Sequence, residues 1–146
     1  MSAEENKALV NRWFEDIFRK GNLAVVEQIF ASNFVNHDPG APPGGWPPGS
    51  DGAKAVAAAY REAFPDVHFT IEDQIVEGDM VVTRWTAQGT NTGSLFGMPP
   101  TGKPVTVTGV QIDRIAGGKI VETWVNYDGL GMMQQLGIIP APGQTS

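Results

Sequence analysis

The chain of 146 residues has no cysteine and only two histidines, His37 and His68. The absence of cysteine excludes disulfide scaffolds, thiolate zinc sites and thiol nucleophiles, and it fits a reducing compartment, so we expect a cytoplasmic protein. The two histidines lie far apart, neither belongs to a motif with metal-ligand spacing, and the acidic residues are scattered. We therefore expect no metal and no other cofactor.

Basic side chains and long apolar runs are also scarce. Ten lysines and arginines stand against sixteen aspartates and glutamates, and they form no cluster that would favour a nucleic-acid partner. No stretch reaches the roughly 20 apolar residues of a membrane helix, and residues 1–7 lack the basic and apolar regions of an export signal. With 41% hydrophobic residues the chain can bury a core, so we expect one soluble domain that acts on an uncharged or apolar small molecule.

The N-terminal half has the pattern of helices. A capping box at residues 2–5 precedes apolar residues at helical spacing, namely Val10, Trp13, Phe14, Ile17 and Phe18. Gly21 ends this helix, a second follows it, and a third begins near Ser50 and stops at Pro65.

Residues 39–49 separate the second and third helices, and nine of these eleven are proline or glycine. Such a run predicts a stiff loop rather than a helix or a central strand. It is either a plain linker or a flap whose Trp46 covers the mouth of a pocket.

After Pro65 the apolar residues alternate with polar ones, which predicts strands at 67–75, 80–88, 105–115 and 119–126. Gly117 and Gly118 form a hairpin turn, and a short last helix begins at Asp128. Three helices, four antiparallel strands and a closing helix predict an α+β fold, in which a curved antiparallel sheet wraps around the N-terminal helices as a cone with a ligand cavity. We expect a single domain at 1–139 and a flexible tail at 140–146.

Three segments carry a resemblance to a known family: Gly97–Lys103 (GMPPTGK), Gly118–Trp124 (GKIVETW) and Asp128–Gly137 (DGLGMMQQLG). With Asn36 and the Arg84–Thr86 segment, they make the chain resemble, over nearly its whole length, the SnoaL-like polyketide cyclase (ester cyclase) family of the nuclear transport factor 2-like superfamily. The resemblance implies a cone-shaped, cystatin-like α+β barrel with a deep apolar pocket. It also implies a homodimer formed through the outer face of the sheet.

The resemblance implies an enzyme that closes a ring by intramolecular aldol addition without a cofactor. In the family an aspartate on the last long strand is the acid and base, and a histidine on the preceding strand assists it. Here those positions hold Val125 and Gln111, and Thr123 stands where a common variant has histidine. The reaction is therefore aldol cyclisation or a diverged lyase, isomerase or hydroxylase reaction. The alternatives are a polyketide hydroxylase-like homologue and a non-catalytic ligand-binding domain.

Three residues are candidates for the acid and base, each with a structural alternative. Asp113 in an apolar cavity would have a raised pKa, or it forms a surface ion pair. Asp128 either acts on the substrate or caps the last helix. His37, at the start of the Pro/Gly loop, is either a general base or a solvated loop residue.

Strand alternation predicts the substrate-binding wall. Val121, Thr123 and Val125 should share one face, beside Gly109, Gln111 and Asp113 on the neighbouring strand. Gln111 is expected to bind a carbonyl or enolate oxygen. The predicted substrate-binding residues are Gln111, Trp13, Asn36, Trp46, Arg84, Thr123 and Val125. Trp124 and Ile120 are expected to point outward into the dimer interface.

Overall fold

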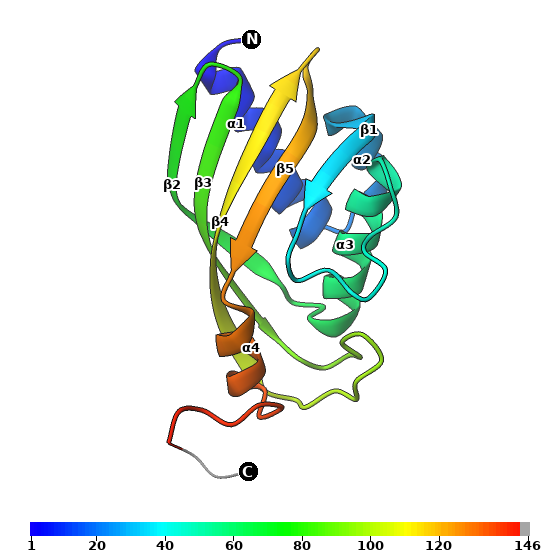
Figure 1. Ribbon diagram of the computed structural model, residues 1–146, viewed down its shortest axis with the longest axis vertical. Helices are drawn as coiled ribbons and strands as arrows, with labels where there is room; N and C mark the ends of the chain where they lie inside the picture. The colour runs from blue at the N-terminus through cyan, green and yellow to red at the C-terminus, as the bar shows by residue number, and fades with distance from the viewer. Residues whose placement is uncertain (144–146) are drawn as a thin grey trace.

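The helices of the N-terminal half pack on the concave face of a curved sheet in the computed structural model, which describes residues 1–143 (Figure 1). The helical segments are α1 (Ala3–Arg12), η1 (Trp13–Arg19), η2 (Leu23–Val25), α2 (Val26–Ile29), α3 (Ser50–Ala63) and α4 (Gly129–Gln135). The strands are β1 (Phe30–His37), β2 (His68–Glu77), β3 (Met80–Thr90), β4 (Pro104–Ala116) and β5 (Lys119–Tyr127). Residues 144–146 of the predicted tail lie outside the described residues.

The first helix begins as predicted and then changes its winding. Ser2 Oγ accepts the Glu5 N–H and the Glu5 carboxylate accepts the Ser2 N–H, both at 3.1 Å, which completes the capping box. From Trp13 the backbone forms the wider turns of a π-helix, and the Lys20 N–H reaches five residues back to the Glu15 carbonyl. This wider segment carries the aromatic side chains that face the sheet.

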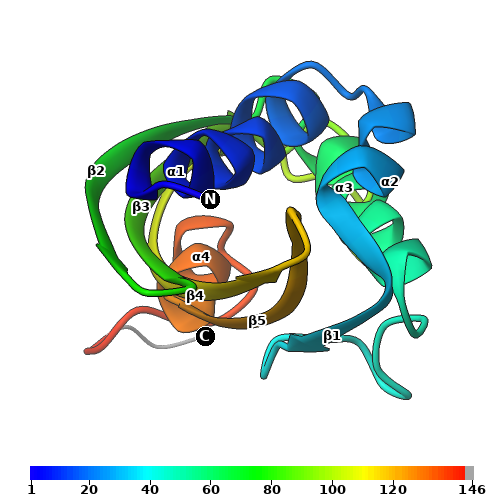
Figure 2. The same cartoon turned by 90° about the horizontal axis from the view of Figure 1, so that it is seen from above.

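The sheet has the strand order β1-β5-β4-β3-β2 and curls around the helices (Figure 2). Its four long strands pair antiparallel, and the predicted α+β architecture with a curved sheet is confirmed. At one edge β1 adds a fifth strand parallel to β5, so the sheet is mixed rather than wholly antiparallel. The expected extended piece after the second helix is therefore a full strand.

A β-bulge in β5 changes which of its residues face inward. Arg114 pairs with Glu122, but the next residue, Ile115, pairs with Ile120, so Val121 is an extra residue on its strand. Because the bulge shifts the alternation by one residue, Ile120 is fully buried in the core. The expectation that Ile120 faces outward was wrong, and Val121 is absent from the cavity wall for the same reason.

Asn91 fixes the loop that follows β3. Its Nδ2 donates to the carbonyls of Ala63 (3.2 Å) and Gly93 (2.9 Å), and its Oδ1 accepts the Thr101 N–H and hydroxyl, both at 2.9 Å. The loop is thereby tied to the end of α3, and Phe96 at its tip has a left-handed backbone with φ 47°. Within residues 1–143, no helix is long and apolar enough to cross a membrane.

Candidate active site

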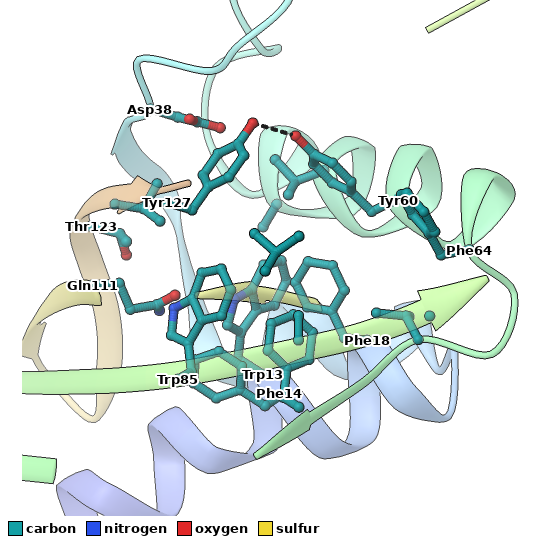
Figure 3. A pocket seen from close by; sticks show the side chains of 18 of the residues that line it. Trp13, Phe14, Phe18, Asp38, Tyr60, Phe64, Trp85, Gln111, Thr123 and Tyr127 are labelled. Carbon is teal, nitrogen blue, oxygen red and sulfur yellow. Dashed lines mark hydrogen bonds between the residues drawn. The ribbon is translucent and has the colours of Figure 1, made fainter. Parts of the chain in front are cut away.

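A cavity lies between the concave face of the sheet and the helices, and its empty volume is about 920 Å³ when the open solvent at its mouth is included. Its wall is rich in aromatic side chains, which include Phe34 from β1 and Phe69 from β2. Figure 3 shows three more from η1, Trp13, Phe14 and Phe18, and Trp85 from β3. Among the described residues no lysine or arginine lines it, and its charged wall residue is Asp38. Such a wall favours a flat, uncharged, largely apolar ligand.

The inner end of the cavity is a polar group built by β4 and β5. Thr123 Oγ1 donates to Asp113 Oδ1 at 2.5 Å, and Gln111 Nε2 donates to Asp113 Oδ2 at 2.9 Å. Gln111, Thr123 and Val125 line the cavity, as the alternation predicted, whereas Asp113 lies behind them and is 1% exposed. The carboxylate therefore reaches the cavity through its two hydrogen-bond partners.

Asp113 is the residue of this polar group whose pKa is strongly shifted. Burial raises the pKa of its carboxyl to about 6, although the hydrogen bonds from Gln111 and Thr123 act in the opposite direction. A carboxyl with this pKa is mostly ionised at pH 7 and still accepts a proton readily. The Asp113 carboxyl can thus exchange a proton at neutral pH.

Two buried polar atoms of the wall have no hydrogen-bond partner in the described part of the chain, Trp85 Nε1 and Asn36 Oδ1. Asn36 pairs in register with Thr123, and Figure 3 shows Trp85 beside Gln111. Trp85 has room there because it faces Gly109, where a Cβ would overlap its indole. A donor and an acceptor left unpaired in an apolar cavity are suited to bind a ligand.

The outer end of the cavity holds a second set of polar groups. The Tyr60 and Tyr127 hydroxyls, from α3 and the end of β5, are 2.7 Å apart and hydrogen-bonded. Asp38, just after β1, accepts the Gly40 N–H at 2.8 Å and the Trp46 indole N–H at 2.9 Å. Trp46, a predicted substrate-binding residue in the loop that is either a linker or a flap, is thus held at the rim and does not line the cavity.

Besides Trp46 and Asp113, three further predicted site residues do not line the cavity. Arg84 points to the outer face because its neighbour Trp85 points inward, and it forms an exposed ion pair with Asp73 at 2.6 Å. His37 lies on the opposite face of β1 from Asn36, where it binds Glu122 at 2.7 Å and stacks on Trp124.

Asp128 has the structural role that was its alternative to catalysis. It caps the N-terminus of α4, where its side chain accepts the Gly131 N–H at 2.9 Å. The predicted roles of Arg84, His37 and Asp128 in the site therefore do not fit the geometry, whereas Trp13 and Asn36 do line the cavity. Within residues 1–143, no group of three or more His, Asp or Glu side chains could hold a metal ion.

The sequence analysis missed Trp85, Asp38 and Tyr60 as wall residues. For Trp85 a signal existed, since alternation required either Arg84 or Trp85 to face inward, and the larger apolar side chain was the better choice. Asp38 and Tyr60 lie on a loop and a helix, and no local pattern connects them with the strands.

Comparison with known proteins gives one consistent family. The family model described as SnoaL-like polyketide cyclase matches residues 8–136. Comparison with curated proteins finds no significant match.

Several solved structures are similar to the chain. IdmH from Streptomyces antibioticus, a proposed polyketide cyclase, is 32% identical with a TM-score of 0.77, covering 90% of this chain and 98% of its own. A proposed polyketide cyclase from Acidithiobacillus ferrooxidans is 29% identical with a TM-score of 0.82, covering 94% and 99%. A proposed SnoaL-like polyketide cyclase from Jannaschia sp. CCS1 is 27% identical with a TM-score of 0.81, covering 96% and 98%. The chain belongs to the SnoaL-like polyketide cyclase family.

Proposed function

We propose that this protein is an enzyme that binds an uncharged polyketide-type carbonyl compound and closes a ring in it by an aldol-type reaction. The observation that carries the proposal is the pair of unpartnered buried atoms, Trp85 Nε1 and Asn36 Oδ1, in the wall that Gln111 and Thr123 also line. Leaving such atoms unpaired costs about 1–3 kcal/mol each, which a bound substrate oxygen and hydroxyl recover. The family membership supports the same reaction class.

The proposed reaction begins with loss of a proton from a carbon next to a carbonyl. Thr123 passes its hydroxyl proton to Asp113 Oδ1 and takes up the substrate proton, since its oxygen lies 2.5 Å from that carboxylate. The resulting enolate carbon forms the new C–C bond with a second carbonyl carbon of the same molecule. The second carbonyl oxygen then becomes an alkoxide and takes the proton back along the same path, so no net proton is gained or lost.

The enolate oxygen needs neutral donors at the inner end. One N–H of the Gln111 amide is used by Asp113, and the other is left for the substrate. The Trp85 indole N–H supplies a second donor. Donors fixed by strand positions stabilise developing charge without rearrangement, and loss of one commonly lowers the rate about 10²–10³-fold.

Thr123→Val tests this path because valine keeps the shape of the side chain and removes the hydroxyl. We expect turnover of a linear polyketide-type diketone ester to fall at least about 10²-fold, with little change in affinity. Thr123→Ser should retain most activity, and Thr108→Val, an exposed position on the neighbouring strand, is the matched control. Single-turnover kinetics measure the chemical step, and wild-type rates in Thr123→Val would contradict the relay.

The second candidate function is ligand binding without catalysis. It is favoured by Val125 at the family's aspartate position and by the location of Asp113 behind the wall. In that case the wild-type protein binds such esters but releases them unchanged, and Thr123→Val alters affinity alone. Product analysis by mass spectrometry separates the two functions.

We also propose that the protein acts as a homodimer joined through the outer face of the sheet. Four apolar residues lie opposite one another across this face in consecutive strands: Ile75, Val82, Ile112 and Trp124. Ile75 at one end of this row is 65% exposed, and a continuous apolar row is favourable for contact with a second copy.

We expect a dimer at micromolar concentration in sedimentation velocity, and Ile112→Lys, at the centre of the row, should produce monomers with an unchanged circular dichroism spectrum. Glu62→Lys, at an exposed position on α3 and away from the outer face of the sheet, is the control that should remain dimeric. A wild-type monomer would contradict the proposal.

A further inference from the structure

The two tyrosine hydroxyls at the outer end of the cavity have an unused hydrogen-bonding capacity. The bond between Tyr60 and Tyr127 consumes one hydroxyl hydrogen, and in the described part of the chain neither hydroxyl has a further hydrogen-bond partner. One phenol hydrogen therefore remains available beside the cavity, which both rings line. The pair can donate a hydrogen bond to an incoming oxygen.

These phenols stay protonated throughout the working pH range. Burial raises the pKa of Tyr60, and its contact with Tyr127 and the charge of Asp38 act in the same direction. Burial also raises the pKa of Tyr127, the hydrogen bond with Tyr60 lowers it, and the charge of Asp38 raises it further. The pair is accordingly a constant neutral donor rather than an acid or base of the reaction.

The surrounding loops hold this pair in place. The backbone of Gly40 packs on the Tyr127 hydroxyl so closely that a Cβ at this position would overlap it. Phe96 lies edge-on to Tyr60 at 5.8 Å and contacts Trp46 at 6.0 Å, between ring centroids. The outer end therefore combines a fixed hydroxyl pair with an aromatic rim.

The spacing between the two ends follows from one strand. Thr123 and Tyr127 are both inward residues of β5, four positions apart, which corresponds to about 13 Å along an extended strand. A ligand that contacts both ends is therefore elongated, with an oxygen near each end and an apolar body against the aromatic wall.

The charge at the outer end restricts the ligand further. Figure 3 shows the Asp38 carboxylate near the Tyr127 hydroxyl, and no cationic side chain among the described residues lines the cavity. A carboxylate or phosphate brought to this end would be repelled and would find no counter-ion. The oxygen bound there is therefore part of a neutral ketone, ester or hydroxyl.

We propose that the Tyr60–Tyr127 pair is a second oxygen-binding site, which selects elongated uncharged substrates carrying an oxygen at each end. This inference rests on the proposed function in one respect, namely that the same cavity takes up the carbonyl substrate. The inner end then holds the reacting carbonyl, and the outer end holds the far oxygen and fixes which carbon faces Thr123.

Rigid steroid ketones test the outer site by isothermal titration calorimetry. Androstanedione has a ketone at each end of an uncharged skeleton, and androstanone has only one. We expect the wild-type protein to bind the diketone about tenfold more tightly, as one additional hydrogen bond implies. In Tyr60→Phe/Tyr127→Phe, which keeps both rings, the diketone should bind no better than the monoketone.

A diketone advantage that survives in the double variant, or that is missing from the wild type, would overturn the outer site. An androstane carboxylate should bind more weakly than androstanone, and Asp38→Asn should reduce this difference; equal binding in the wild type would overturn the selection against charge. If the tyrosine variant behaves as expected while Thr123→Val turns over normally, the catalytic proposal fails alone. A wild-type protein that takes up neither ketone contradicts both proposals.

Discussion

Replacing Asp113 by asparagine is expected to raise the free energy of unfolding at pH 7 while abolishing turnover. Burial raises the pKa of this carboxyl from 3.8 to about 6, so keeping it ionised in the folded protein costs about 3 kcal/mol. Asparagine removes the charge and retains the shape, and the Gln111 amide can turn to accept its N–H. The same substitution removes the proton acceptor of the proposed reaction.

The stabilisation should depend on pH in a defined direction. Between pH 3.8 and about 6 the folded wild type holds more protons on Asp113 than the unfolded chain does, so its stability falls as the pH rises. The advantage of Asp113→Asn should therefore be absent below about pH 4 and complete above pH 6. Urea unfolding at several pH values measures it, with the exposed Asp73→Asn as control. An advantage that does not change with pH would show that Asp113 is not ionised in this way.

Adding one methyl group at Gly109 should destabilise the protein and close the cavity. A Cβ there would overlap the six-membered ring of the Trp85 indole, which already packs against Phe69 at 5.2 Å between ring centroids. In Gly109→Ala the indole must shift toward the cavity, at a cost of about 1–3 kcal/mol typical of overpacking. Thermal unfolding measures the first effect, and calorimetric titration with androstanedione measures the loss of binding.

A second substitution identifies the cause. Trp85→Phe shortens the side chain that meets the new methyl group, so the destabilisation by Gly109→Ala should shrink in the Trp85→Phe background. Strictly additive effects of the two substitutions would mean that strand conformation at Gly109, and not contact with Trp85, explains the loss of stability.

The predictable part of the site is the part that depends on regular strand geometry. Alternation grouped Gln111, Thr123 and Val125 on one face, and the family resemblance indicated that this face lines the cavity. Both steps hold because β4 and the second half of β5 have no irregularity there. Ile120 and Val121 were placed wrongly because either residue is apolar enough for the core, so hydrophobicity alone does not reveal the bulge between them.

The remaining errors come from contacts that are distant in the sequence. The parallel pairing of β1 with β5 joins residues 30–37 to residues 120–124, and no turn signal connects them. The outer end of the cavity likewise brings Asp38, Tyr60 and Tyr127 together from a loop, a helix and a strand. Periodicity describes each segment alone, and these positions depend on how the segments assemble.

The π-helical segment Trp13–Arg19 determines the directions in which its aromatic side chains enter the cavity. In an α-helix each residue advances the side-chain direction by about 100°, and a wide turn accommodates one residue more per turn than regular winding does. Loss of a single residue from this segment would restore regular winding and rotate Trp13 and Phe14 relative to Phe18 without moving any strand. The substrate range of this scaffold can therefore change through the length of one helix, while Asp113 and Thr123, the residues proposed to transfer the proton, keep their places on the sheet.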